Sequence, residues 1–280
     1  MNPTVAIIAQ GAMGAGIGGR LTERGLRVVT SLAGRSEASA QRAAAAGMIP
    51  VSDQEAARAD YFLSIVPPSD ALSLAEKMAT LIAPNNKKPI YVDCNALSPP
   101  SVERIAAVIA ATGCPFVGAG IIGPPPKPGS RNTKFYASGA QAAEFARLKD
   151  YGLIVRVLQG PLTAASALKM SYAGITKGFT ALGATMLLAA RRGGSAEALK
   201  AELAESQSAL FGWLSRQVPA MYPKAYRFVA ELDEIANFVG EDKPEHEMLS
   251  AAARLYERIA EDFEGEKKEV GAMDEFLKSP

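Results

Sequence analysis

Short apolar runs alternate with helical patterns over about the first 160 residues of the chain. The apolar runs predict strands at residues 5–9, 27–31, 61–66, 90–93, 116–117, 134–137 and 154–158. The segments between them predict helices at residues 15–24, 37–46, 71–82, 102–111 and 140–151. This alternation is typical of a mostly parallel sheet with helices on both faces. We therefore predict a doubly wound α/β domain over residues 1–160.

No strand pattern continues beyond Pro161, so residues 161–280 are predicted to form an all-helical domain. Its first helix, over residues 162–190, ends where Arg191, Arg192 and Gly193 suit a helix C-terminus. Prolines punctuate further helical segments, and the charged stretch 264–280 is predicted to be frayed.

The long helix at residues 162–190 has an apolar stripe and an opposite face of small residues. The stripe consists of Ala165, Leu168, Tyr172, Ile175, Phe179, Leu182, Met186 and Ala189, spaced by three and four. The opposite face carries Ser166, Ala173, Thr176, Thr180 and Ala184. Both faces need cover, and the other C-terminal helices offer too little surface for that. We therefore expect a homodimer with isologous packing of these helices.

Lys169 and Lys177 are the only charged residues between residues 162 and 190. A lysine in so apolar a setting needs a partner or a chemical role, so both are candidate catalytic residues. The alternative is that each lysine lays its stem along apolar surface and reaches solvent. A membrane span is disfavoured, because two lysines in its first half would be costly in lipid.

Composition excludes several classes of function. Thirty Lys and Arg residues balance 29 Asp and Glu residues, so neither nucleic acid nor a membrane is expected as a partner. Two cysteines and one histidine, His246, form no cluster with metal-ligand spacing, and we expect no metal. The N-terminus shows no secretion signal, and we expect a cytoplasmic location.

The turn after the first strand has the spacing of a dinucleotide-binding fingerprint. Residues 9–14 read AQGAMG, with alanine in the place of the first glycine. Such a turn opens a helix whose N-terminus can hold a pyrophosphate, as in Rossmann domains. The predicted cofactor-binding residues here are Gly11, Ala12, Met13 and Gly14. The alternative is a plain strand-to-helix turn.

The end of the second strand indicates which cofactor binds. An NAD site usually has an acidic residue there for the ribose, and residues 28–34 contain none. Arg35 and Ser36 follow instead, and a guanidinium and a hydroxyl suit a 2′-phosphate. We therefore predict NADP (NADPH) as cofactor. The alternative is that Arg35 is solvated and Ser36 only caps the helix that begins at Glu37.

Four segments resemble the β-hydroxyacid dehydrogenases, which include 6-phosphogluconate and 3-hydroxyisobutyrate dehydrogenases. Closer still are uncharacterised relatives with a short all-helical C-terminal domain (DUF1932-like). The segments are the GAMG turn at 11–14, Val66-Pro67, the DCNALSP stretch at 93–99 and the approach from Gly160 to Lys169. The resemblance implies that Val66 and Pro67 bind the cofactor, that Asn95 lies near the nicotinamide, and that Lys169 is the catalytic lysine.

The chain departs from the family pattern in the substrate region. The family's substrate loop falls on residues 118–124, which read GAGIIGP, so Gly120, Ile121, Ile122 and Gly123 are the implied substrate-binding residues. The serine that would bind a substrate carboxylate is Ile122 here. Ala173 replaces the asparagine that follows the lysine, which leaves its hydrogen bond to Tyr172 or Thr176.

A proline-rich run at residues 123–129 follows the implied substrate loop. It is too short to link two domains. Two readings stay open: a stiff wall of the pocket, or an inert surface loop.

Together these features predict an NADP-dependent dehydrogenase or reductase acting on a small hydroxy or oxo compound. In the family mechanism a lysine exchanges the hydroxyl proton while the nicotinamide carries the hydride. Lys169 fits that role, and Lys177 is the second candidate. The alternatives are an imine reductase-like enzyme, against which the retained lysine argues, and a sensor that binds NADP without turnover.

Overall fold

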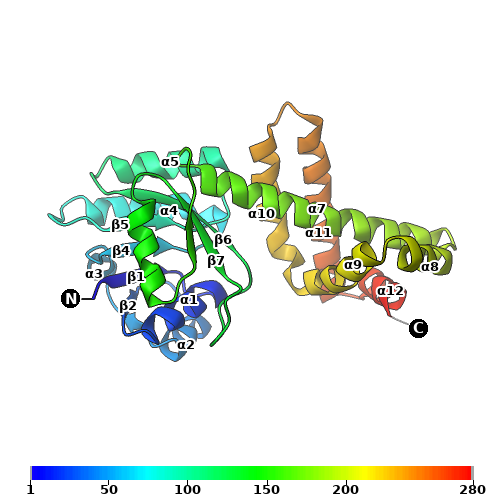
Figure 1. The fold of residues 1–280 in the computed structure, drawn as a ribbon, viewed down its shortest axis with the longest axis horizontal. Helices are drawn as coiled ribbons and strands as arrows, with labels where there is room; N and C mark the ends of the chain where they lie inside the picture. The colour runs from blue at the N-terminus through cyan, green and yellow to red at the C-terminus, as the bar shows by residue number, and fades with distance from the viewer. Residues whose placement is uncertain (1, 279–280) are drawn as a thin grey trace. The chain divides into compact units, whose positions relative to one another are not determined.

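The structure of the chain, a computed structural model, describes residues 2–278. These residues form two compact units, which divide between Met170 and Ser171 (Figure 1). The first unit thus extends past the predicted boundary at residue 160. It includes the first turns of the long helix α7 (Ala164–Arg192), which pack against strand β6.

An eight-stranded sheet with the order β3-β2-β1-β4-β5-β6-β7-β8 forms the centre of the first unit. Its strands are β1 (Thr4–Ile8), β2 (Arg27–Thr30), β3 (Ile49–Pro50), β4 (Tyr61–Ser64), β5 (Ile90–Asp93), β6 (Phe116–Ile122), β7 (Lys134–Ser138) and β8 (Val155–Val157). Neighbouring strands are parallel except β6 and β7, which pair antiparallel with Gly120 opposite Tyr136. The predicted α/β fold class is confirmed.

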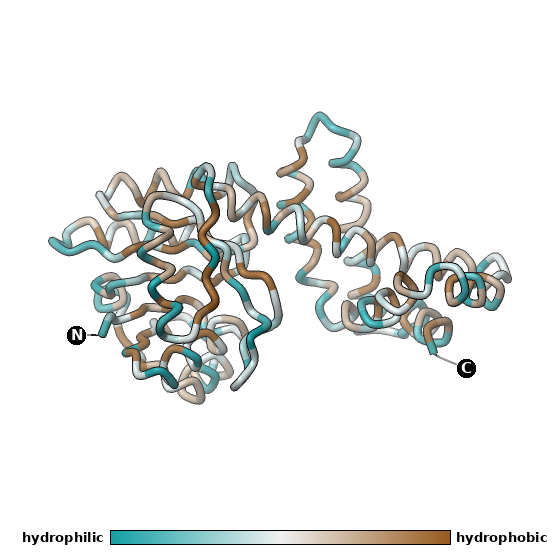
Figure 2. The backbone as a smooth tube through the Cα atoms, viewed as in Figure 1, coloured by the Kyte–Doolittle hydropathy of each residue, from teal (hydrophilic) through white to brown (hydrophobic). Residues whose placement is uncertain are grey.

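Helices cover both faces of this sheet. They are α1 (Ala12–Thr22), α2 (Glu37–Ala45), α3 (Asp53–Ala56), α4 (Pro68–Ile82), α5 (Pro99–Ala110), α6 (Ala142–Phe145) and the 3₁₀ helix η1 (Ala146–Tyr151). One core packs α1, α2 and α6 on one face, around Ile17, Leu21 and Phe145. The other packs α3, α4 and α5 on the opposite face, around Met78 and Ile105. In Figure 2 the inner strands are accordingly coloured as hydrophobic.

Several elements of the first unit differ from the predicted ones. Strand β3 was not predicted, because it has only two residues and both are exposed. Strand β6 continues to Ile122, although Gly118 and Gly120 lower the strand propensity of the sequence there. The predicted helix at 140–151 is a short α-helix followed by a 3₁₀ helix.

The second unit contains the rest of α7 and five further helices among the described residues. These are α8 (Ala196–Ser206), α9 (Ser208–Met221), α10 (Ala225–Val239), α11 (Pro244–Glu264) and α12 (Lys268–Leu277), with the 3₁₀ helix η2 (Tyr222–Lys224) after α9. The all-helical prediction is confirmed. The prediction of a frayed stretch at 264–280 is wrong for α12, because Val270, Met273 and Phe276 are buried.

The two faces of α7 have different environments in the second unit. Ala173, Thr180 and Ala184 on the small face are at most 5% exposed. A Cβ placed on Gly183 would lie 2.3 Å from a methyl carbon of Leu214, so this face packs closely on α9. The predicted stripe is left open, and its central residues Tyr172, Ile175, Phe179, Leu182 and Met186 are 48–60% exposed.

Length and composition alone would allow α7 to cross a membrane, and it is the one helix among residues 2–278 of which this is true. A third of its most apolar 18-residue window (33%) is buried inside the protein. Core helices of soluble proteins pass the same test, so it is weak evidence for a span.

Candidate active site

The turn between β1 and α1 leaves open space over a helix N-terminus. Gly11 is the N-cap of α1, and a Cβ placed on it would have no atom within 4 Å. A Cβ on Gly14 would lie 1.9 Å from the carbonyl oxygen of Ala9, so only glycine lets the strand and the helix approach there. Ala12 and Met13 form the first turn of α1 between these glycines. The free backbone amides and the open space fit the pyrophosphate of a dinucleotide.

Asn95 connects the carboxyl ends of β4 and β5. Its Oδ1 accepts a hydrogen bond from the Val66 amide at 2.7 Å, and its Nδ2 donates to Ser64 and Asp93 at 2.9 and 3.0 Å. The side chain is therefore engaged by the protein at both ends. Asn95 holds the loop of Val66 and Pro67, from which α4 begins, at the point where the strand order reverses. Ligands of doubly wound sheets bind at such a switch point.

The carboxyl group of Asp93 is buried beneath this loop. Burial raises its pKa to about 6, although the backbone and side-chain hydrogen bonds from Asn95 oppose the rise. Asp93 therefore titrates in a mildly acidic range while it anchors Asn95.

Basic side chains gather near the end of β2. Arg35 lies in the loop before α2, and Ser36 caps that helix by accepting a hydrogen bond from the Ser39 amide at 3.4 Å. Arg42 Nε donates to the carbonyl of Gln10, inside the cofactor turn, at 2.9 Å. Arg42 was not among the predicted site residues. Its contact with Gln10 depends on how α2 packs beside the turn, which no sequence pattern specifies.

An acidic side chain also reaches the end of β2, from another element. Asp53 on α3 hydrogen-bonds with Ser31 and pairs with Lys77 of α4 at 2.6 Å. The acid-free stretch 28–34 did not reveal it, since Asp53 follows the short strand β3, which was not predicted.

Two glycines of β6 let the first turns of α7 lie directly on that strand. A Cβ on Gly118 would lie 2.6 Å from the carbonyl oxygen of Leu162, and one on Gly120 would lie 3.0 Å from Cβ of Lys169. Helix α7 thus follows β6 towards its carboxyl end, and Lys169 arrives beside Gly120. The structure brings together the predicted acid/base residue and Gly120 of the implied substrate loop.

Two serines fasten this start of α7 to the sheet. The Ser138 hydroxyl accepts a hydrogen bond from the Ala165 amide at 3.0 Å and donates one to the Leu162 carbonyl at 2.6 Å. Ser166 donates to the carbonyl of Leu97, in the loop that also contains Asn95. Lys169 follows Ser166 by one turn, so it lies on the same side of α7, beside Gly120 in the carboxyl half of β6.

Lys177 has a different environment, in the second unit. Its Nζ pairs with Glu231 at 2.9 Å, and both side chains are nearly buried, with 11% and 15% exposure. The ammonium also lies 4.7 Å from the centre of the Phe228 ring, and Tyr256 donates to the Lys177 carbonyl. These contacts favour a structural role for Lys177.

The other implied substrate-binding residues have mixed environments. Ile121 belongs to the core and is 6% exposed, whereas Ile122 is partly exposed. Gly123 has a positive φ of 122°, and a Cβ there would lie 2.1 Å from the Asn132 carbonyl oxygen. On α7, the Tyr172 side chain is exposed, and the Thr176 hydroxyl donates to the Tyr172 carbonyl of the same helix at 2.9 Å.

The proline-rich loop at 123–129 packs against α1. A Cβ on Gly16 would lie 2.9 Å from the Pro126 carbonyl oxygen, and Arg20 donates to the Lys127 carbonyl at 2.9 Å. These contacts place the loop beside the helix that carries the cofactor turn. They support its reading as a wall of the site.

One further hollow in the first unit lies away from this site. A shallow hollow lined by Phe116, Gly139, Val157 and Leu162 lies at the opposite edge of the sheet, where β6 begins and β7 ends. Among residues 2–278 there is no group of three or more His, Cys, Asp or Glu side chains that could hold a metal ion.

The strand order, the glycine turn and the switch-point loop define a Rossmann-type domain that binds a nicotinamide dinucleotide. Residues 4–151 match the NAD-binding domain of 6-phosphogluconate dehydrogenase, and the chain belongs to this family of NAD(P)-dependent oxidoreductases. Residues 190–259 match DUF1932, a domain of unknown function. The resemblance stated from the sequence is confirmed.

Solved structures show the same fold over nearly the whole chain. The conserved protein MTH1747, described as structurally similar to 3-hydroxyacid dehydrogenases, is 29% identical with a TM-score of 0.72, covering 92% of this chain and 97% of its own. Mycobacterium tuberculosis 3-hydroxyisobutyrate dehydrogenase with L-serine is 19% identical with a TM-score of 0.73, covering 94% and 95%. An imine reductase variant from Myxococcus stipitatus with NAD+ is 17% identical with a TM-score of 0.62, covering 99% and 100%.

Proposed function

We propose that the protein is an NADP-dependent dehydrogenase or reductase for a small hydroxy or oxo compound, with Lys169 as general acid and base. The close approach of Gly120 to Lys169 carries this proposal. It supports a role for this lysine beside the implied substrate loop, on the strand that runs towards the sheet edge where the dinucleotide turn lies.

The chain's own residues have three tasks in this proposal. Gly11 and the N-terminus of α1 bind the pyrophosphate, and Asn95 holds the loop of Val66 against the cofactor region. The bound nicotinamide supplies or accepts a hydride. Lys169 Nζ gives a proton to the substrate oxygen during reduction and takes it back during oxidation. Ser138 and Ser166 fix the helix that carries this lysine.

The NADP preference is supported by the basic groups around the end of β2. Arg35 and Arg42 can face a 2′-phosphate, and Ser36 adds a hydroxyl. Arg35→Ala should weaken NADPH binding by roughly 1.5–3 kcal/mol and leave NADH binding nearly unchanged. Titration of each reduced cofactor measures this. Equal losses for both cofactors, or a wild type that prefers NADH, contradict the assignment.

The substrate is proposed to be less acidic than the family's usual hydroxy acids. Ile122 stands where a carboxylate-binding serine is implied, and its side chain offers no donor. A panel of small alcohols, aldehydes, ketones and hydroxy acids with NADP+ or NADPH tests the class. Turnover confined to the carboxylates contradicts this refinement, and no turnover despite tight NADPH binding supports a sensor instead.

Imine reduction is the second candidate. Ala173 stands where the family pattern has an asparagine, so α7 lacks the side-chain amide that would assist the conversion of a hydroxy acid. Ala173 is buried, with 1% exposure. The retained Lys169 favours the first candidate. A lysine can exchange a proton with a substrate oxygen, whereas the reduction of a protonated imine involves no such oxygen. Cyclic imines in the same panel, with NADPH, distinguish the two reactions.

We also propose a homodimer formed through α7. Five large apolar side chains on one face of this helix are about half exposed, while its other face is packed on the C-terminal helices. A continuous apolar stripe of this size marks an association surface, and a second copy covers it by isologous packing. Light scattering at micromolar concentration should show a dimer, and Leu182→Asp should give a monomer. A wild-type monomer with full activity contradicts this proposal.

A further inference from the structure

The chain segments that leave β2 and β3 run side by side. Thr30 and Pro50 are register partners, and the Val51 amide donates to the Thr30 carbonyl at 2.9 Å. The next residues, Ser31 on one segment and Ser52 and Asp53 on the other, therefore meet at the carboxyl edge of the sheet. This is the position at which an adenosine ribose binds in a Rossmann domain.

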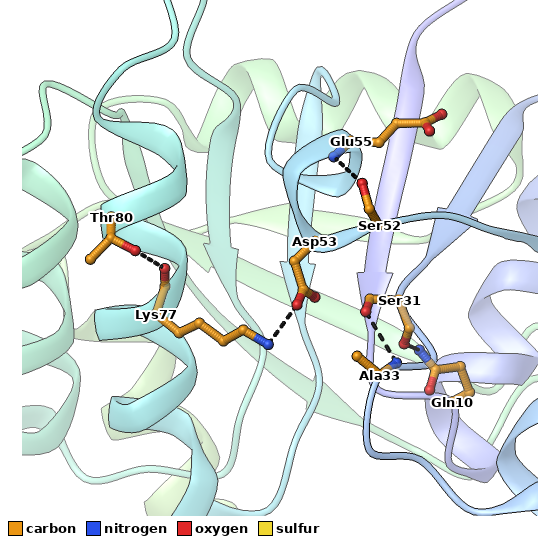
Figure 3. Close-up of polar contacts among 8 residues, drawn as sticks. All are labelled: Gln10, Ser31, Ala33, Ser52, Asp53, Glu55, Lys77 and Thr80. Carbon is orange, nitrogen blue, oxygen red and sulfur yellow. Dashed lines mark hydrogen bonds and ion pairs between the residues drawn. The ribbon is translucent and has the colours of Figure 1, made fainter.

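Asp53 lies between Ser31 and Lys77 (Figure 3). Lys77 reaches from α4 to the carboxylate at 2.6 Å. Partial burial would raise the pKa of Asp53, but hydrogen bonds from Lys77 and Ser31 and the charges of Lys77 and Arg35 hold it below its usual value. The carboxylate is therefore ionised at neutral pH.

An ionised carboxylate at this position normally favours NAD over NADP. It can accept hydrogen bonds from the ribose hydroxyls, whereas it repels a 2′-phosphate. Here the charge is paired by a lysine from a different helix. The Lys77 side chain is 52% exposed and that of Asp53 is 20% exposed, so a bound cofactor can sense both charges.

We propose that the Asp53–Lys77 pair is a second determinant of cofactor choice, in which Lys77 neutralises the carboxylate so that the site accepts a 2′-phosphate. This inference rests on the proposed NADP-dependent function. The proposal predicts that removal of Lys77 weakens NADPH binding only while the Asp53 carboxylate is present. If Lys77 instead contacted the 2′-phosphate directly, its removal would weaken NADPH binding with or without that carboxylate.

The test is a double-mutant cycle on the full-length protein, read as the dissociation constants of NADPH and NADH. Lys77→Met should weaken NADPH binding roughly tenfold at low salt and less at high salt. The Asp53 carboxylate would then repel the 2′-phosphate, and salt screens this repulsion. NADH binding should stay within about twofold. The double variant Asp53→Asn/Lys77→Met should regain most of the NADPH affinity.

Two further variants control for folding and for helix α3 itself. Lys77→Arg keeps the charge and should keep the NADPH preference. Glu55→Gln, on α3 like Asp53, breaks the half-exposed pair of Glu55 with Arg27 of β2 and should change neither affinity. Thermal unfolding of each variant checks that it is folded.

Two outcomes would overturn the inference: an unchanged preference in folded Lys77→Met, or a loss that persists in the double variant. Binding is measured without turnover, so a failed substrate panel leaves this result intact. A wild type that binds NADH as tightly as NADPH overturns both the inference and the NADP assignment.

Discussion

Gly120 lies directly against Lys169: a methyl group on the glycine would put its carbon 3.0 Å from Lys169 Cβ and 2.9 Å from the Ala165 carbonyl oxygen. Such contacts are too short for a side chain, so the strand and helix α7 can meet only at a glycine. The position of the candidate acid/base residue therefore depends on β6 as much as on α7.

Gly120→Ala should displace the start of α7 and lower both stability and activity. Overpacking of this kind costs about 1–3 kcal/mol, and the shift of Lys169 should lower kcat further. Gly178→Ala, on α7 itself, is the control, because its added carbon meets no atom within 4 Å. Urea unfolding and turnover check both variants; a Gly120→Ala enzyme with wild-type kcat would show that Lys169 is not held by this contact.

The two glycines of the cofactor turn should respond differently to alanine. Gly14→Ala should unfold or severely destabilise the first unit, because its Cβ would lie 1.9 Å from the Ala9 carbonyl oxygen. Gly11→Ala should fold normally, since the space above Gly11 is open, but should weaken dinucleotide binding by filling that space. Circular dichroism and cofactor titration measure the two effects. Unchanged cofactor affinity in the Gly11 variant would place the pyrophosphate elsewhere.

Lys177→Met should lower stability more than catalysis. It would remove the ion pair of Lys177 with the nearly buried Glu231, and breaking a buried ion pair costs up to about 3–5 kcal/mol. Lys177→Met/Glu231→Leu removes both charges and should recover much of that loss. Urea unfolding gives the stabilities, and kcat per folded molecule should stay near the wild-type value. A folded variant that has lost turnover would instead give Lys177 a catalytic role.

Asp93 should make stability depend on pH in a direction opposite to that of a salt-bridged carboxylate. Its pKa rises from 3.8 to about 6 on folding, so the folded protein holds this proton where the unfolded chain has lost it. The stabilisation of the folded protein by protonated Asp93 is fully present below about pH 4 and is lost as pH rises through about 6. The free energy of unfolding changes by up to about 3 kcal/mol over this range. Asp93→Asn should remove this dependence. A difference in unfolding free energy between wild type and variant that is constant from pH 4 to 7 contradicts the shift.

Local patterns predicted the parts of the site that are close together in sequence. The turn at Gly11 and Gly14 follows one strand and opens one helix, and Lys169 was marked by its apolar surroundings. The periodicity also predicted the apolar stripe on α7, whose central residues are exposed in the second unit; that this stripe needs cover stays a prediction.

The contacts that were missed join residues far apart in the chain. Asp53 reaches Ser31 only because the two-residue strand β3 pairs with β2, and so short a strand has no readable periodicity. Arg42 reaches the Gln10 carbonyl from a helix whose orientation no pattern specifies. The charged residues of α12 hide the apolar face of Val270, Met273 and Phe276, so the pattern there predicts a frayed tail instead of a packed helix.

The catalytic assignment is tested most directly by Lys169→Met on the best substrate found in the panel. General acid–base groups contribute about 10²–10⁴-fold, so kcat should fall by that factor while the dissociation constant of NADPH stays unchanged. The matched variant Lys177→Met should keep kcat per folded molecule. A Lys169→Met enzyme that binds NADPH and retains near-normal kcat would show that this lysine is structural, and would contradict the proposed mechanism.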